Sequence, residues 1–138
     1  MATDRLHHVP AGSCTGGTAQ TSGMTRYAAI TGDAVGAGAL WMGRTHVAPR
    51  ATSGPHHHGH SETGIYVVSG TPAFVYVEDG REVRIRTQPG DFVFVPPYVP
   101  HVESNEDSDE EAVVVIARTT QEAIVVNLDG LASQTAAG

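Results

Sequence analysis

The sequence contains no lysine, and all eight of its basic residues are arginine. Without lysine the chain cannot form a Schiff base with a substrate, nor hold a phosphate as the lysine of a Walker-type loop does. The 15 Asp and Glu residues give a net charge of −7. This excess of negative charge argues against nucleic acid or an anionic membrane as the main partner.

Cysteine is nearly absent as well, since Cys14 is the only one. A single cysteine excludes an internal disulfide and a cysteine-rich zinc site, and it fits a reducing compartment. No stretch approaches the ~20 apolar residues that a membrane-spanning helix needs, and residues 1–10 hold no apolar signal core. We therefore predict a cytoplasmic protein, with Cys14 as an incidental loop thiol.

Leucine is scarce, because the chain has 4 leucines against 17 valines. Branched residues such as valine favour strands, and the 16 glycines and 8 prolines are typical of turns between them. No long segment has the period of a helix, whereas short apolar runs recur along the chain. We expect strands within residues 26–31, 38–48, 56–62, 64–69, 72–78, 81–86, 91–95, 112–118 and 122–127.

Turn signals separate these runs. Asp79 and Gly80 favour a tight hairpin, and Pro96 followed by Pro97 ends a strand because proline cannot donate to its neighbour. Many short strands without helices between them indicate an all-β fold, an antiparallel barrel or sandwich. We divide the chain into an irregular arm over residues 1–25, a β-barrel over residues 26–130 that includes an acidic loop at 103–111, and a tail over residues 131–138.

Four histidines fall within five positions, namely His56, His57, His58 and His60. In a strand alternate side chains share a face, so His56, His58 and His60 point one way and His57 the other. Neutral imidazole binds zinc, iron, nickel, copper or manganese, and a ligand from a distant segment has to complete the coordination sphere. His101 follows a strand end and is that ligand. The sequence predicts a site for one divalent transition metal.

The residues around these histidines resemble the two signature motifs of the cupins. The first motif is matched from His56 and His58 to the closing Gly70, and the second from Gly90 to Asn105, with its proline, histidine and asparagine in place. The resemblance covers residues 55–105. It implies a jelly-roll β-barrel with a metal in its interior, and a homodimer in which the N-terminal arm joins a neighbour's barrel.

The sequence departs from the cupin pattern in three positions. Arg50 and Tyr98 stand where the motifs have glycine, and counting back from Gly70 places Thr63 where the family has its glutamate ligand. Glu62 lies one position early, and a slip of one residue turns a side chain to the other face unless a bulge restores it. The fourth ligand is therefore His60, or Glu62 through a bulge, or absent. If Glu62 is not a ligand, it is the best candidate for a catalytic acid or base.

A bound dication with an open position can polarise a carbonyl, activate a water molecule or hold a substrate beside dioxygen. We expect the barrel interior to form an apolar pocket for a small, flat molecule. Arg44 or His46 could orient a polar group of the substrate. We predict that the pocket is lined by residues of the central strands and turns, namely Trp41, Arg44, Tyr66, Phe74, Tyr76, Phe92, Phe94 and Tyr98.

Small metal-binding cupins include polyketide cyclases, isomerases and quercetin-type dioxygenases. The resemblance implies an enzyme that acts on a small oxygenated molecule, aromatic or polyketide-like, by Lewis-acid cyclase or isomerase chemistry. Two alternatives stay open at this point. One is a metal-dependent dioxygenase of flavonols or diketones, and the other is a cupin that binds a small molecule without turnover.

Overall fold

The computed structural model describes residues 5–21, 23–122 and 124–131, with the backbone alone for residues 17–21. Its strands are β1 (Thr15–Thr21), β2 (Met24–Ile30), β3 (Trp41–Val47), β4 (His56–His57), β5 (Thr63–Ser69), β6 (Ala73–Glu78), β7 (Arg81–Arg86), β8 (Phe92–Val95), β9 (Val102–Ser104), β10 (Ala112–Arg118) and β11 (Val126–Asn127). Two short helical segments, a 3-10 turn at Ala11–Ser13 and α1 at Gly32–Val35, precede β3.

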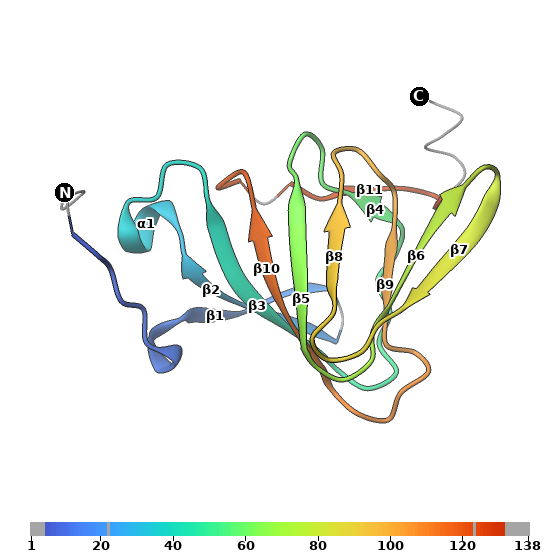
Figure 1. The fold of residues 1–138 in the computed structure, drawn as a ribbon, viewed down its shortest axis with the longest axis horizontal. Coiled ribbons are helices and arrows are strands. Elements are labelled where there is room, and N and C mark those ends of the chain that lie inside the picture. Colours follow the sequence, from blue (N-terminus) through green and yellow to red (C-terminus); the bar gives the residue numbers. More distant parts are fainter. Residues whose placement is uncertain (1–4, 22, 123, 132–138) are drawn as a thin grey trace.

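The strands form three antiparallel sheets. A six-stranded sheet has the order β1-β2-β3-β10-β5-β8, and a three-stranded sheet has the order β7-β6-β9. The short pair β11-β4 lies near one end of both, between β8 and β6 (Figure 1). Neighbouring strands that are distant in the chain, such as β3, β10 and β5, tie the two halves of the sequence together. The structure confirms the predicted all-β, antiparallel class.

Alternation of side chains along the strands places the core between the sheets. In β5, Ile65 and Val67 are buried, and in β10 Val114 is fully buried. These residues form one hydrophobic cluster with Phe74 of β6 and Val95 of β8. Because the cluster takes residues from both sheets, burial of its apolar surface holds the sheets face to face.

The hairpin predicted at Asp79 and Gly80 is present. Both residues have positive φ, 52° and 76°, which is the conformation that a two-residue hairpin turn needs. The register of β6 and β7 closes on the pair Glu78 and Arg81. The local sequence alone was sufficient for this element, because the turn geometry follows from its two central residues.

The expectation of an irregular arm over residues 1–25 is wrong for β1. Residues 15–21 pair with β2, from Thr15 opposite Ala28 to Thr21 opposite Met24. The segment is rich in glycine and threonine, and it becomes a strand because the edge of β2 offers backbone partners. The short helix α1 was also not expected. It begins at Thr31, whose hydroxyl accepts a hydrogen bond from the amide of Ala34, as an N-cap does.

The acidic stretch over residues 103–111 contains strand as well as loop. Val102–Ser104 forms β9 beside β6. The following carboxylates are not all free, since Arg50 pairs with Asp109 at 2.5 Å and Arg84 with Glu106 at 2.9 Å. The tail predicted over residues 131–138 lies outside the described residues apart from Leu131. The part of the chain that the structure describes has no helix of the length and hydropathy that crossing a membrane requires.

Asn105 fixes the acidic loop to the end of β3. Its side chain is buried, and Nδ2 donates to the carbonyl oxygens of Val47, Ala48 and Glu110 at 3.4, 3.1 and 2.9 Å. One amide therefore satisfies three backbone acceptors from two segments. A buried acceptor that loses its donor costs stability, because no water replaces the lost hydrogen bond.

We predict that Asn105→Ala lowers the free energy of unfolding by about 2–3 kcal/mol, since three carbonyl oxygens lose their donor. Urea unfolding followed by circular dichroism measures the change. Glu110→Gln is the control, because the Glu110 side chain is exposed, and it should change the stability by less than about 0.5 kcal/mol. Equal midpoints for the two variants would show that Asn105 does not anchor this loop.

Candidate metal centre

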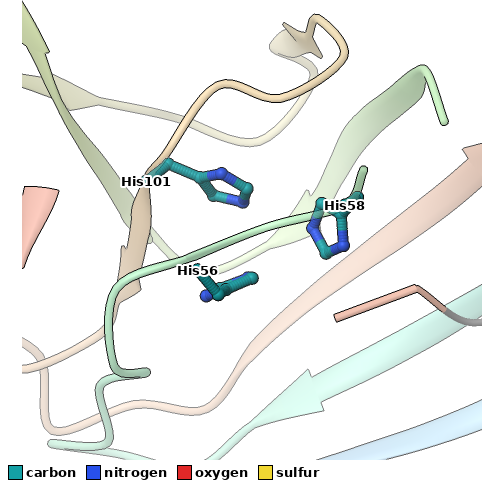
Figure 2. Close-up of side chains that lie close together, drawn as sticks. All are labelled: His56, His58 and His101. Carbon is teal, nitrogen blue, oxygen red and sulfur yellow. The ribbon is translucent and has the colours of Figure 1, made fainter. Parts of the chain in front are cut away.

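Three of the predicted histidines converge. A nitrogen of His56, one of His58 and one of His101 lie within 4.8 Å of one another. The ring centroids are 4.5 to 5.1 Å apart, and the three rings point toward one another (Figure 2). Three imidazoles at such separations can donate lone pairs to one metal ion.

Backbone pairing brings these histidines together across 45 residues of sequence. His56 N–H donates to the carbonyl of His101 at 3.1 Å, and His101 N–H donates to the carbonyl of His56 at 2.9 Å. The two residues form an isolated antiparallel bridge, and β4 on the other side pairs with β11. His58 follows directly after β4, so all three side chains depend on the same short segment.

Hydrogen bonds also set the orientation of each ring. Nδ1 of His56 lies 2.8 Å from the carbonyl of Gly54, and Nδ1 of His58 lies 2.9 Å from the carbonyl of Ile124. In the same way, Nδ1 of His101 lies 3.1 Å from the carbonyl of Val99. A carbonyl oxygen can only accept, so each Nδ1 carries the proton and each Nε2 keeps a lone pair. Metal-binding histidines in proteins are held by this kind of outer hydrogen bond.

Burial keeps these imidazoles neutral. It lowers the pKa of His56, lowers the pKa of His58 to about 4 and lowers the pKa of His101 to about 3. Repulsion between the neighbouring rings acts in the same direction, because a protonated ring would face two others. At neutral pH all three Nε2 atoms are therefore available as ligands. The donor set fits a divalent transition metal such as zinc, iron, nickel or manganese.

His60 does not join this group. The strand that contains His56 ends at His57, and a turn follows in which Gly59 has a φ of +58° and the amide of Ser61 donates to the carbonyl of His58. The turn breaks the alternation of side chains, and His60 is exposed. The expectation that His60 shares a face with the other ligands is therefore wrong for this conformation.

Glu62 is also exposed and lies outside the cavity of the three histidines. Its backbone pairs with Thr119, whose hydroxyl accepts from the Glu62 amide at 3.0 Å, and no bulge turns the carboxylate inward. Thr63, one residue later, is buried and lines the cavity, and its hydroxyl has no partner among the described residues. Of the three alternatives for the fourth ligand, the described residues support the site with three histidines.

The three rings line one cavity of about 380 Å³. Apolar walls are provided by Met24, Ile65, Phe74 and Ile116. These side chains come from both large sheets, so the cavity opens from the core between them. A volume of this size admits a small organic molecule beside a metal ion.

Several residues predicted to line this pocket lie on the outer surface instead. Tyr66, Phe94 and Tyr98 are 38%, 60% and 58% exposed. In β5 the residues that face inward are Thr63, Ile65 and Val67, so Tyr66 faces outward and packs on Phe92, whose ring is also exposed. Phe94 is outward in β8 for the same reason. These aromatic side chains do not contact the cavity of the three histidines.

The other predicted wall residues are divided between different environments. Arg44 lies outward on β3, where its guanidinium covers the ring of Tyr27 at 4.8 Å and donates to His46. Tyr76 lines a second cavity of about 260 Å³ and donates its hydroxyl to Glu78. Trp41 is buried, and its ring contacts the guanidinium groups of two arginines, but it does not line the cavity. Of the predicted wall, Phe74 alone lines the cavity of the three histidines.

Three charged residues in the cavity wall were missed by the sequence analysis, namely Arg26, Glu103 and Arg118. Signals for them exist in the strand alternation. Glu103 lies two residues after His101, and Arg118 continues the inward series of Val114 and Ile116 in β10. Burial raises the pKa of Glu103 to about 7, and its Oε1 has no partner among the described residues.

Comparison with known proteins agrees with this architecture. The cupin domain model matches residues 43–117. Oxalate decarboxylase from Bacillus subtilis at pH 4.6 aligns with a TM-score of 0.67 and 22% identity over 79% of this chain and 28% of that chain. A structure in which the Mn(II) centres of the same enzyme were assigned gives the same score and identity over 79% and 29%.

These likenesses show the fold alone, because the identity is low. This chain spans less than a third of the length of these two solved chains. No curated protein sequence matches it.

We predict that His101→Ala weakens zinc binding by at least about 100-fold. Loss of an outer hydrogen bond to a ligand alone costs about 10–100-fold, so loss of the ligand costs more. Competition with a chromophoric chelator measures the affinity. His60→Ala is the matched control, since it removes an exposed histidine from the same segment, and it should leave the affinity within about twofold. Equal losses of zinc affinity in both variants would show that His60 is also a metal ligand.

Proposed function

Since this chain belongs to the cupin family, we propose that it is a metal-dependent enzyme that acts on a small oxygenated molecule. In this proposal His56, His58 and His101 hold one divalent transition metal through Nε2. The observation that carries it is the set of three convergent imidazoles, His101 buried and His56 and His58 half-buried, each held by a backbone carbonyl at Nδ1. A purely structural histidine cluster has no need for three unpaired, neutral Nε2 atoms in a cavity.

The bound metal supplies Lewis-acid character, which polarises a carbonyl or stabilises an enolate oxygen. The residues of the chain do the remaining work. Met24, Ile65, Phe74 and Ile116 exclude water from the reacting molecule, and the unpaired hydroxyl of Thr63 offers it a hydrogen bond. Oε1 of Glu103 is a shielded acceptor in the same cavity. Glu103 thus lines the cavity, whereas Glu62, the carboxyl group expected from the sequence, is exposed.

We favour Lewis-acid cyclase or isomerase chemistry because three neutral ligands leave the full charge on the metal. A dioxygenase of flavonol or diketone type is the alternative. Bacillus subtilis oxalate decarboxylase has Mn(II) centres, which supports manganese among the candidates zinc, iron, nickel and manganese for this site. The aromatic part of the proposed substrate class has less support, because Phe74 is the only Phe, Tyr or Trp side chain among the described lining residues.

The third candidate is a cupin that binds a small molecule without turnover. It shares the cavity and the histidines with the enzyme, so it differs only in the fate of the ligand. In either case we propose a small molecule as the main partner, in a reducing compartment such as the cytoplasm, and not nucleic acid or a membrane. A homodimer remains a prediction, and within one chain β1 already pairs with β2.

The test removes metal with a chelator and reloads the protein with zinc, manganese, iron or nickel in separate samples. Each sample receives acetylacetone or quercetin, with oxygen uptake followed by an electrode and products by mass spectrometry. We expect metal-dependent conversion without oxygen uptake, and none in His101→Ala. The variant His60→Ala is the control that should keep the activity of the unaltered chain.

Three other outcomes would change this proposal. Conversion with stoichiometric oxygen uptake would overturn the Lewis-acid chemistry in favour of a dioxygenase. Binding of either compound without conversion by any metal form would favour the non-catalytic cupin. Conversion that His101→Ala retains would overturn the proposed metal centre.

A further inference from the structure

Two arginines share one aromatic ring at the edge of the cavity. Arg118 of β10 places its guanidinium carbon 3.9 Å from the centroid of Trp41, and Arg26 of β2 places its own 5.3 Å from the same centroid. Trp41 lies directly opposite Arg118 in the register of β3 and β10. The buried ring of Trp41 therefore makes cation–π contacts with both guanidinium groups.

Both guanidinium groups belong to the same cavity as the three histidines. Arg26 and Arg118 line it together with His56, His58 and His101. A molecule in the cavity can therefore contact the arginines and the histidines together.

The charge of Arg118 is not balanced by an acidic side chain. Among the residues that the structure describes, no carboxylate forms an ion pair with Arg118, although this arginine is only 6% exposed. Within the described part of the chain, its side chain donates to the backbone carbonyls of Thr120 and Gln121, at 3.5 and 3.4 Å. Burial, followed by the charge of Arg26, lowers the pKa of Arg118 to about 10.

Other arginines of the chain behave differently. Arg50, Arg84 and Arg86 are paired with carboxylates of the acidic stretch on the surface. The one carboxyl among the described lining residues, Glu103, takes part in no ion pair. The buried charge of Arg118, with the charge of Arg26 close by, is unfavourable unless an anion joins it.

We infer that Arg26 and Arg118 bind the carboxylate of the substrate, while a second oxygen of the same molecule reaches the site of the three histidines. The planar guanidinium fork matches a carboxylate and binds it through two parallel hydrogen bonds. The apolar walls, among them Ile65, Phe74 and Ile116, cover the carbon skeleton between the two ends. The substrate class is then a small carboxylate with a carbonyl or hydroxyl group at its far end.

This inference rests on the proposed function for the role of the histidine end, but the arginine end can be tested alone. Trp41 is the only tryptophan of the chain, so its fluorescence reports directly on this position. The chelator-treated protein is titrated with benzoate and with benzamide, which has a similar shape and no charge. We expect saturable binding of benzoate and at least tenfold weaker binding of benzamide.

Substitution locates the site. Arg118→Gln and Arg26→Gln should each weaken benzoate binding by about 10-fold or more, because a hydrogen bond to a charged group is lost. Arg44→Gln is the matched control, since it removes the same charge from the outer face of β3, and it should change the affinity less than twofold. Arg118→Lys, which keeps the charge without the fork, should give an intermediate affinity. Calorimetry confirms each affinity independently of the tryptophan signal.

Several outcomes would overturn the inference. Equal affinities for benzoate and benzamide would show that no charge is recognised. Equal losses in Arg118→Gln and Arg44→Gln would show only a general effect of net charge, and tighter binding of inorganic phosphate would point to a phosphorylated ligand instead. If Arg118→Gln does not fold, as urea unfolding would show, the comparison of Arg26→Gln with Arg44→Gln decides.

The two proposals can fail separately. The chelator-treated protein holds no metal, so benzoate binding by the arginines is measured there without any contribution from the metal centre. Loss of the metal centre would thus leave the arginine result standing. Intact metal binding together with absent benzoate binding would remove the arginine proposal alone.

Discussion

The pair of backbone hydrogen bonds between His56 and His101 is the contact on which the site depends. It joins two segments that lie far apart in the sequence, and it does so at the residues that carry two of the three imidazoles. His58 is placed by the same segment, one residue after β4 ends. Shifting this bridge by one residue would turn the rings away from one another, because neighbouring side chains along an extended chain point in opposite directions.

The cavity is organised by charge as well as by shape. Its histidine end is neutral, since burial lowers the pKa values of His56, His58 and His101, and each Nδ1 is fixed by a carbonyl. Its other end is cationic, through two guanidinium groups on Trp41. The cavity wall therefore combines neutral imidazoles with cationic guanidinium groups, and apolar side chains line it as well. Such a gradient orients a molecule with unlike ends before any chemistry takes place.

Local rules predicted the fold well and the cavity walls poorly. The hairpin at Asp79 and Gly80 follows from two residues, and the alternation of His56 and His58 placed both rings on one side. Alternation says which residues share a face, but not which face is inside, and β5 has Ile65 on one face and Tyr66 on the other. The turn at Gly59 and the pairing of β1 depend on contacts that a single segment does not encode. Because of these contacts, His60 is exposed and the glycine-rich arm forms β1.

The absence of lysine has a consequence for how the cavity responds to its surroundings. A buried lysine readily loses its proton, and its amine is open to acetylation, whereas a guanidinium keeps its charge. Even with its pKa lowered to about 10, Arg118 stays protonated at neutral pH. The positive potential at this end is therefore constant across physiological conditions. The charge state of an incoming molecule at these two guanidinium groups is therefore set by its own ionisation, because theirs does not change.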